Sequence, residues 1–158
     1  MLREEILRGS DRFYDLARMP NAKMLLLQAA ATVAKKPTAA TQAVKLAARL
    51  MDVVVHKHWL FGYHEACGFT DDAHIRLTAP QVLAAPLHLY LMSRRAHPFS
   101  MLGMVHVRNR IQCTQPLEVG VPYEVVAGIG ATRQVRQGLE FDVHTAFCKM
   151  QKLFGPAP

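Results

Sequence analysis

Apolar residues first follow a helical period and later alternate, which divides the chain into three regions. The first region holds three stretches with helical character, residues 2–19, 22–35 and 38–51. Pro20 and Pro37 end the first two of them, since proline cannot continue a helix. We therefore expect residues 1–52 to form a helical N-terminal extension, either a cap on the domain or an adaptor.

The second region carries the strongest helical signal of the chain. Residues 57–68 predict a helix that ends at Gly68, and residues 79–95 predict a longer one. The longer helix is apolar nearly all round between residues 82 and 92, so a core must cover most of its sides. Thr78 and Gln81 have the spacing of a capping box at its start.

The third region changes to a period of two. Alternation predicts three strands, at residues 105–113, 121–129 and 139–147. One buried helix followed by three alternating strands is typical of an α+β fold, with an antiparallel sheet curved about the helix.

Composition narrows the class of protein. The chain has 158 residues, of which 51% are hydrophobic and 20% charged, as in a globular domain. Its longest apolar stretch, residues 24–34, is too short for a transmembrane helix, which needs about 20 residues. The three cysteines have no spacing typical of a disulfide framework or a zinc site. We therefore expect a cytoplasmic protein without a membrane span.

The net charge of +7 lies mostly near the N-terminus. Residues 1–60 carry ten Lys and Arg against five Asp and Glu, and the remainder carries nine against seven. A basic end can contact nucleic acid, anionic lipid or a phosphorylated cofactor. The aromatic residues there are too widely spaced for single-strand binding, so we expect a solvated basic face and no nucleic-acid partner.

Several short runs in the second and third regions resemble the MaoC-like hot-dog family of acyl-thioester hydratases and dehydratases. The matching runs are residues 63–69, 77–82, 86–92, 103–109, 115–117 and 138–143. The resemblance covers residues 59–147 and is closest to the non-catalytic half of double hot-dog members. It implies a hot-dog domain over residues 53–158, a long central helix wrapped by a curved sheet, and a substrate carried on coenzyme A or acyl carrier protein, with no other cofactor.

The family's acid–base motif, Gly-Asp-x-Asn-Pro-x-His, is incomplete here. Gly68 and His74 match it, but Phe69 stands where the catalytic aspartate belongs. Asp71 stands in the place of the asparagine and Asp72 in that of the proline. Phenylalanine cannot transfer a proton, so the resemblance implies a domain that binds acyl thioesters but is non-catalytic or depends on a partner.

Two other functions stay open. The chain could be an active enoyl-thioester hydratase, a lyase, in which His74 is the base and Asp71 or Asp72 assists it. It could also be an acyl-thioester binding or thioesterase module.

Three further residues are candidates for substrate binding. His88 interrupts the apolar helix and is either a hydrogen-bonded core residue or a ligand-binding one. Arg94 and Arg108 could hold the phosphates of coenzyme A, which the arginine side chain fits well. We expect no metal site, because His56 and His58 have no third ligand in reach.

The end of the chain predicts a partner. A hot dog has a further strand after the one at residues 139–148, and residues 152–158 are too short and too rich in proline to form it. The sheet would then have an incomplete C-terminal edge, and unpaired edges attract partners. We expect a homodimer or a second hot-dog subunit.

Overall fold

The computed structural model describes residues 1–32, 44–70 and 74–150. The elements, in chain order, are α1 (Leu2–Gly9), β1 (Arg12–Leu16), α2 (Ala22–Ala31), β2 (Leu46–Val54), α3 (Lys57–Cys67), α4 (Ala79–Ser93), β3 (Pro122–Val135) and β4 (Gly138–Lys149). The four strands form one sheet in the order β1-β2-β3-β4. The fold class is therefore α+β, as predicted, and this architecture is compatible with a hot-dog-like fold.

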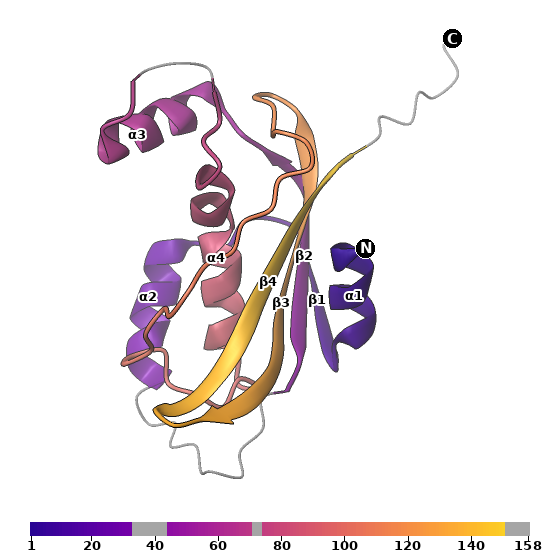
Figure 1. The fold of residues 1–158 in the computed structure, drawn as a ribbon, viewed down its shortest axis with the longest axis vertical. Coiled ribbons are helices and arrows are strands. Elements are labelled where there is room, and N and C mark those ends of the chain that lie inside the picture. Colours follow the sequence, from indigo (N-terminus) through magenta and orange to yellow (C-terminus); the bar gives the residue numbers. More distant parts are fainter. Residues whose placement is uncertain (33–43, 71–73, 151–158) are drawn as a thin grey trace.

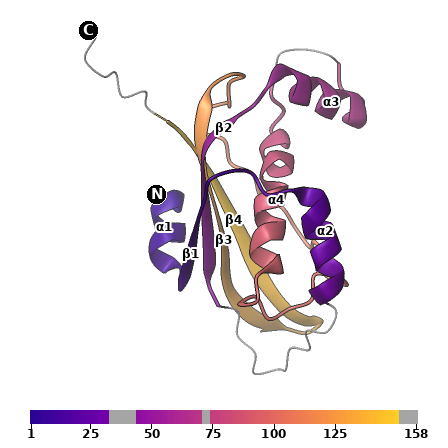
Figure 2. The ribbon, with the colours of Figure 1, turned by 180° about the vertical axis from the view of Figure 1, so that it is seen from behind.

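The helices cover both faces of the sheet. Figure 1 shows α1 on one face and α4 on the other, with α2 beyond α4, and the view from behind in Figure 2 has the same order. Ala84, Leu87 and Leu91 of α4 are fully buried against the central strands. Val82 is the only residue of α4 that is exposed, so the predicted burial of this helix on most sides is confirmed.

The predicted helices of the N-terminal region are partly wrong. The first ends at Gly9, and residues 12–16 form the edge strand β1, which pairs in parallel with β2. Residues 46–51 of the third stretch also lie in a strand, while its start falls outside the described residues. The sheet is thus mixed rather than antiparallel throughout, and it crosses the boundary predicted between residues 52 and 53.

Burial explains why β2 is a strand despite its helix-forming alanines. The sheet is covered on both faces here, so Leu46, Ala47 and Ala48 are all buried, without alternation. Ala48 faces the α4 core, whereas Ala47 packs with Ile6 of α1 on the other face. A strand buried on both faces loses the period-two pattern that identifies strands in a sequence.

In the C-terminal half, the observed elements agree better with those predicted from the sequence. Strands β3 and β4 form the predicted antiparallel pair, and α3 ends as predicted at Gly68, which has the left-handed φ of 68°. The strand predicted at residues 105–113 is absent, however: these residues are extended but pair with no strand in the described part of the chain.

The capping box predicted at Thr78 is also absent. The Thr78 hydroxyl makes no capping bond to the first turn of α4 and lies 2.6 Å from the Tyr63 hydroxyl instead. Thr78 has helical dihedrals (φ −84°, ψ −18°), whereas a side-chain cap needs an extended residue. The start of α4 is thus joined to α3 by this hydroxyl pair.

Helix α1 is attached to the outer face of the sheet by an ion pair and a close contact. Arg3 donates to both carboxylate oxygens of Glu124 on β3, with Nη2 2.9 Å from Oε1. Glu124 is 7% exposed and needs this partner, because an unpaired buried carboxylate is costly. Ile6 of α1 lies directly over Gly128, where an added Cβ would be 2.6 Å from its Cγ2 atom.

We expect Gly128→Ala to destabilise the protein by about 1–3 kcal/mol, since the new methyl group overpacks against Ile6. Urea unfolding of the variant measures this loss. Gly130→Ala is the matched control on the same strand, because its Cβ would meet nothing closer than 3.6 Å. The double variant Ile6→Ala/Gly128→Ala should lose less free energy of unfolding than the sum of the losses in the two single variants. Equal losses at Gly128 and Gly130 would contradict the contact.

Candidate functional site

The clearest polar pair inside the fold joins α4 to β4. His88, on the buried side of α4, places its Nε2 atom 2.6 Å from the Thr145 hydroxyl oxygen of β4. Burial, with a smaller effect of His106, lowers the pKa of His88 to about 4. The imidazole is therefore neutral near pH 7. His88 is a hydrogen-bonded core residue that can also offer a neutral polar contact to a ligand.

The surface next to this pair is incompletely covered. Phe141, Val143 and Thr145 alternate along β4, and Phe141 and Phe147 pack toward the α4 core. Val143 therefore faces the same side of the sheet, yet 37% of it is exposed. An apolar position open to solvent thus lies two residues from the Thr145 hydroxyl.

The extended segment 104–113 runs beside this region and carries Arg108. His106 of this segment acts on the pKa of His88, and its Nε2 atom lies 2.8 Å from the carbonyl oxygen of Arg108. The Arg108 guanidinium lies 3.8 Å from the carboxylate of Glu140 on β4, and the side chain is largely exposed. Glu140 alternates with Phe141 and Thr145 along β4, so Arg108 pairs with a carboxylate on the face of the sheet opposite to His88.

Arg94, the third candidate for substrate binding, directly follows α4. It caps the C-terminal end of α4, where its guanidinium stacks 4.1 Å from the centre of the Tyr90 ring. Its Nε atom donates to the Tyr90 carbonyl and its Nη2 atom to the Ser93 hydroxyl. These contacts with a helix terminus account for a basic side chain at this position.

His74 lies at the opposite end of α4, before its first turn, and is exposed. The predicted assistants Asp71 and Asp72 lie outside the described residues. The structure thus places His74 apart from Arg94, at opposite ends of the same helix.

Phe69 takes part in an aromatic cluster. Its ring meets the rings of Tyr63 and His64, and the Arg76 guanidinium lies 5.2 Å from its centre. Two aromatic rings and a guanidinium group thus contact the Phe69 ring.

The backbone amides at the start of α4 also have partners. The amide of Ala79 donates to the Arg76 carbonyl, and that of Gln81 donates to the Thr78 carbonyl. Pro80, between them, has no amide hydrogen. A thioester oxygen at this helix terminus would therefore have to displace local hydrogen bonds.

His64 is a site residue that the sequence interpretation missed. It is 1% exposed, and neither ring nitrogen has a hydrogen-bond partner in the described part of the chain. Its ring meets Phe69 edge-on. Its position four residues after the buried Leu60, on one side of α3, is the signal that could have identified it.

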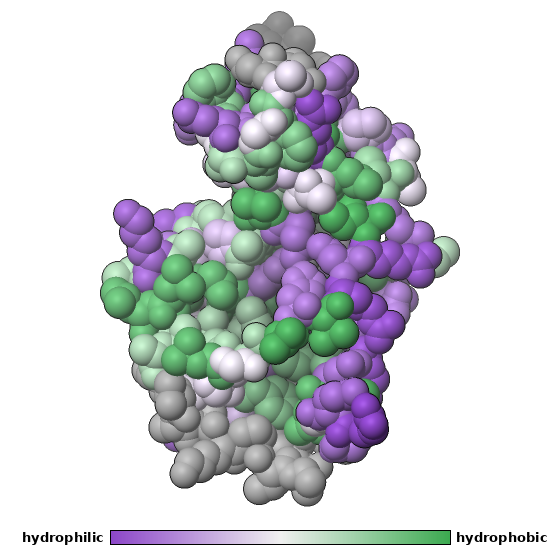
Figure 3. Space-filling model, turned by 60° about the vertical axis from the view of Figure 1, so that its left-hand side comes forward, coloured by the Kyte–Doolittle hydropathy of each residue, from purple (hydrophilic) through white to green (hydrophobic). Residues whose placement is uncertain are grey.

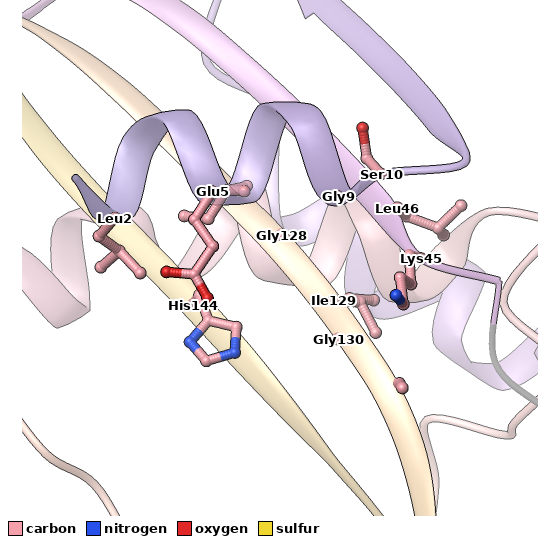
Figure 4. A pocket seen from close by; sticks show the side chains of 12 residues that line it. Leu2, Glu5, Gly9, Ser10, Lys45, Leu46, Gly128, Ile129, Gly130 and His144 are labelled. Carbon is pink, nitrogen blue, oxygen red and sulfur yellow. The ribbon is translucent and has the colours of Figure 1, made fainter.

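A pocket of about 270 Å³ lies on the other side of the sheet, under α1. Figure 4 shows Glu5 extending toward His144, with the side-chain-free backbone of Gly128 and Gly130 beneath the helix. Of the predicted site residues that the structure describes, none lines this pocket, and the sheet lies between it and α4, which carries His88.

Comparison with family models, with curated proteins and with solved structures finds no match. Within the described residues, no three His, Cys, Asp or Glu side chains are grouped so that they could hold a metal ion. Those residues also contain no helix with the length and hydropathy that crossing a membrane requires.

We expect His88 to make stability depend on pH. Its pKa is lower in the folded state than in the unfolded state, so the unfolded state binds the proton first as the pH falls. Stability should decline below about pH 6.5, and the decline due to His88 should level off below about pH 4, after a loss of up to about 3 kcal/mol.

Denaturant unfolding between pH 7 and pH 4 measures this loss, with His88→Gln as the reference that removes the titration. The difference between wild type and variant isolates His88 from the carboxylates that titrate lower. A difference that is independent of pH would contradict the buried, neutral imidazole.

Proposed function

We propose that the chain is a hot-dog-like domain that binds acyl thioesters and lacks a complete acid–base pair of its own. The observation that carries the proposal is the exposed Val143 beside the His88–Thr145 pair. An acyl chain needs apolar surface, and its thioester needs a few fixed polar groups. Here the apolar side chain of Val143 and the polar His88–Thr145 pair lie on the side of β4 that faces α4.

The residues at the N-terminal end of α4 support the proposal that the acid–base pair is incomplete. A hydratase needs a proton-transfer group beside the thioester, and donors that stabilise the developing enolate. Phe69 occupies the aspartate position within an aromatic cluster, and the amides of Ala79 and Gln81 are already bonded. We therefore propose that catalysis, where it occurs, depends on a partner.

The edge of the sheet supports such a partner. Strand β4 is an end strand of the described sheet, and the segment beside it exposes 82% of Val105 and 68% of Val107. Apolar side chains next to an unpaired edge favour association. We propose that a second copy, or a second hot-dog subunit, pairs along this edge.

Binding is tested by titrating a saturated acyl-coenzyme A into the protein in a calorimeter. We expect Val143→Asp to weaken binding at least about tenfold, since it places a charge against the acyl chain. Phe61→Asp is the control, because it changes a similarly exposed apolar residue on α3. Unchanged affinity in Val143→Asp would overturn the proposed site.

Catalysis is tested with crotonyl-coenzyme A. We expect no hydration above background from the purified chain, and no effect of His74→Ala or Asp71→Ala. Hydration that either change abolishes would identify an active hydratase instead.

Thioester hydrolysis is a second candidate function, favoured by the short distance between a hydroxyl and an imidazole. The Thr145 oxygen could attack the thioester carbon while its proton passes to Nε2 of His88, the thiolate leaves, and water later releases the acid. The low pKa of His88 makes it a weak base, so this function ranks second. Release of free thiol that Thr145→Val abolishes would favour it.

A further inference from the structure

Helix α2 is apolar on the side that faces solvent as well as on the side that faces the core. Leu25 and Ala29 are buried, whereas Met24, Leu26 and Leu27 are 54%, 59% and 70% exposed. Large apolar side chains gathered on an exposed helix face commonly mark an interaction site. The outward side of α2 therefore has the composition of a contact surface.

This outward side belongs to a firmly held helix. The Asn21 side chain accepts hydrogen bonds from the amides of Lys23 and Met24 at the start of α2. At the other end, the Thr32 hydroxyl donates to the Ala29 carbonyl and accepts from the Met101 amide. The exposed side chains are thus presented in a fixed arrangement, which lowers the entropy cost of binding.

The helix forms the outer layer of the molecule. In Figures 1 and 2, α4 lies between α2 and the sheet. The outward side of α2, with Lys23, Met24, Leu26 and Leu27, therefore projects as a ridge. Figure 3 shows hydrophobic residues gathered on this side of the protein. A ridge fits a broad, deformable surface rather than a peptide that needs a groove.

The charges around the ridge are of one sign. Residues 17–32 and 93–104 contain four basic residues and no acidic one. Of these, Lys23 lies within the ridge, at helical spacing to Leu26 and Leu27, and is exposed, as are Arg18 and Arg95. Two copies packed ridge to ridge would bring their Lys23 side chains together, so an anionic surface is the better complement.

We propose that α2 docks the protein on anionic phospholipid membranes. Met24, Leu26 and Leu27 enter the boundary between headgroups and acyl chains, and Lys23 and Arg18 pair with lipid phosphates. The contact is peripheral and reversible, because three side chains of a ten-residue helix cannot span a bilayer. The proposal is independent of acyl-thioester binding.

The test is flotation of the full chain with vesicles of phosphatidylcholine alone, or with about 30% phosphatidylglycerol. We expect binding to the anionic vesicles that weakens as salt is raised. Leu27→Ser and Lys23→Glu should each lower the partition coefficient at least about fivefold, by removing insertion and charge pairing respectively.

Phe61→Ser and Arg136→Glu are the matched controls, since they change an exposed apolar residue on α3 and an exposed cation at the β3–β4 turn. Both should retain binding within about twofold. Circular dichroism confirms that each variant is folded. Absence of binding to anionic vesicles, or equal losses in Lys23→Glu and Arg136→Glu, would overturn the proposal. So would a dimer that Leu27→Ser dissociates, because the ridge would then be an interface between copies.

Discussion

The fold depends on the burial of one apolar helix. Helix α4 has hydrophobic side chains around most of its circumference, and each uncovered one costs free energy in water. The sheet covers the side that holds Leu87 and Leu91, while α2 and the segment after α4 cover much of the remainder. The two helices, the sheet and their connections are therefore one cooperative unit.

The same constraint explains where polar chemistry can occur. A histidine within this interface must be neutral and hydrogen-bonded, and His88 meets both conditions through Thr145. At the start of α4, by contrast, Phe69 lies in an aromatic cluster, and the amides of Ala79 and Gln81 donate to nearby backbone carbonyls. Polar groups of this interior are therefore neutral or paired within the fold.

The sequence predicts those elements whose cause is local. Gly68 ends α3 because of its backbone freedom, and β3 and β4 pair across a short turn, so both could be predicted. Strand β2 could not be predicted in this way. Its alanines favour a helix, and they are extended here because both faces of the sheet are covered. In residues 105–113 apolar and polar side chains alternate as in a strand. A strand also needs a neighbour to pair with, and the alternation does not show whether one is present.

The candidate site likewise contains some features that the sequence predicts and others that only the fold shows. His88 could be identified from its isolation on an apolar helix, but its partner Thr145 is 57 residues away and is known only from the fold. His74 precedes α4 and Arg94 follows it, and their places relative to His88 depend on where the helix begins and ends. His64 could have been predicted as buried from its position four residues after Leu60, but its contact with Phe69 is known only from the fold.

Native-state hydrogen exchange tests the central claim, that α4 is enclosed by the sheet, most directly. Amides of α4 should exchange together with those of β3 and only through global unfolding, whereas those of α1 should exchange through smaller openings. Exchange of the α4 amides well before those of β3 would contradict the enclosed helix, and with it the ligand site that we propose beside His88.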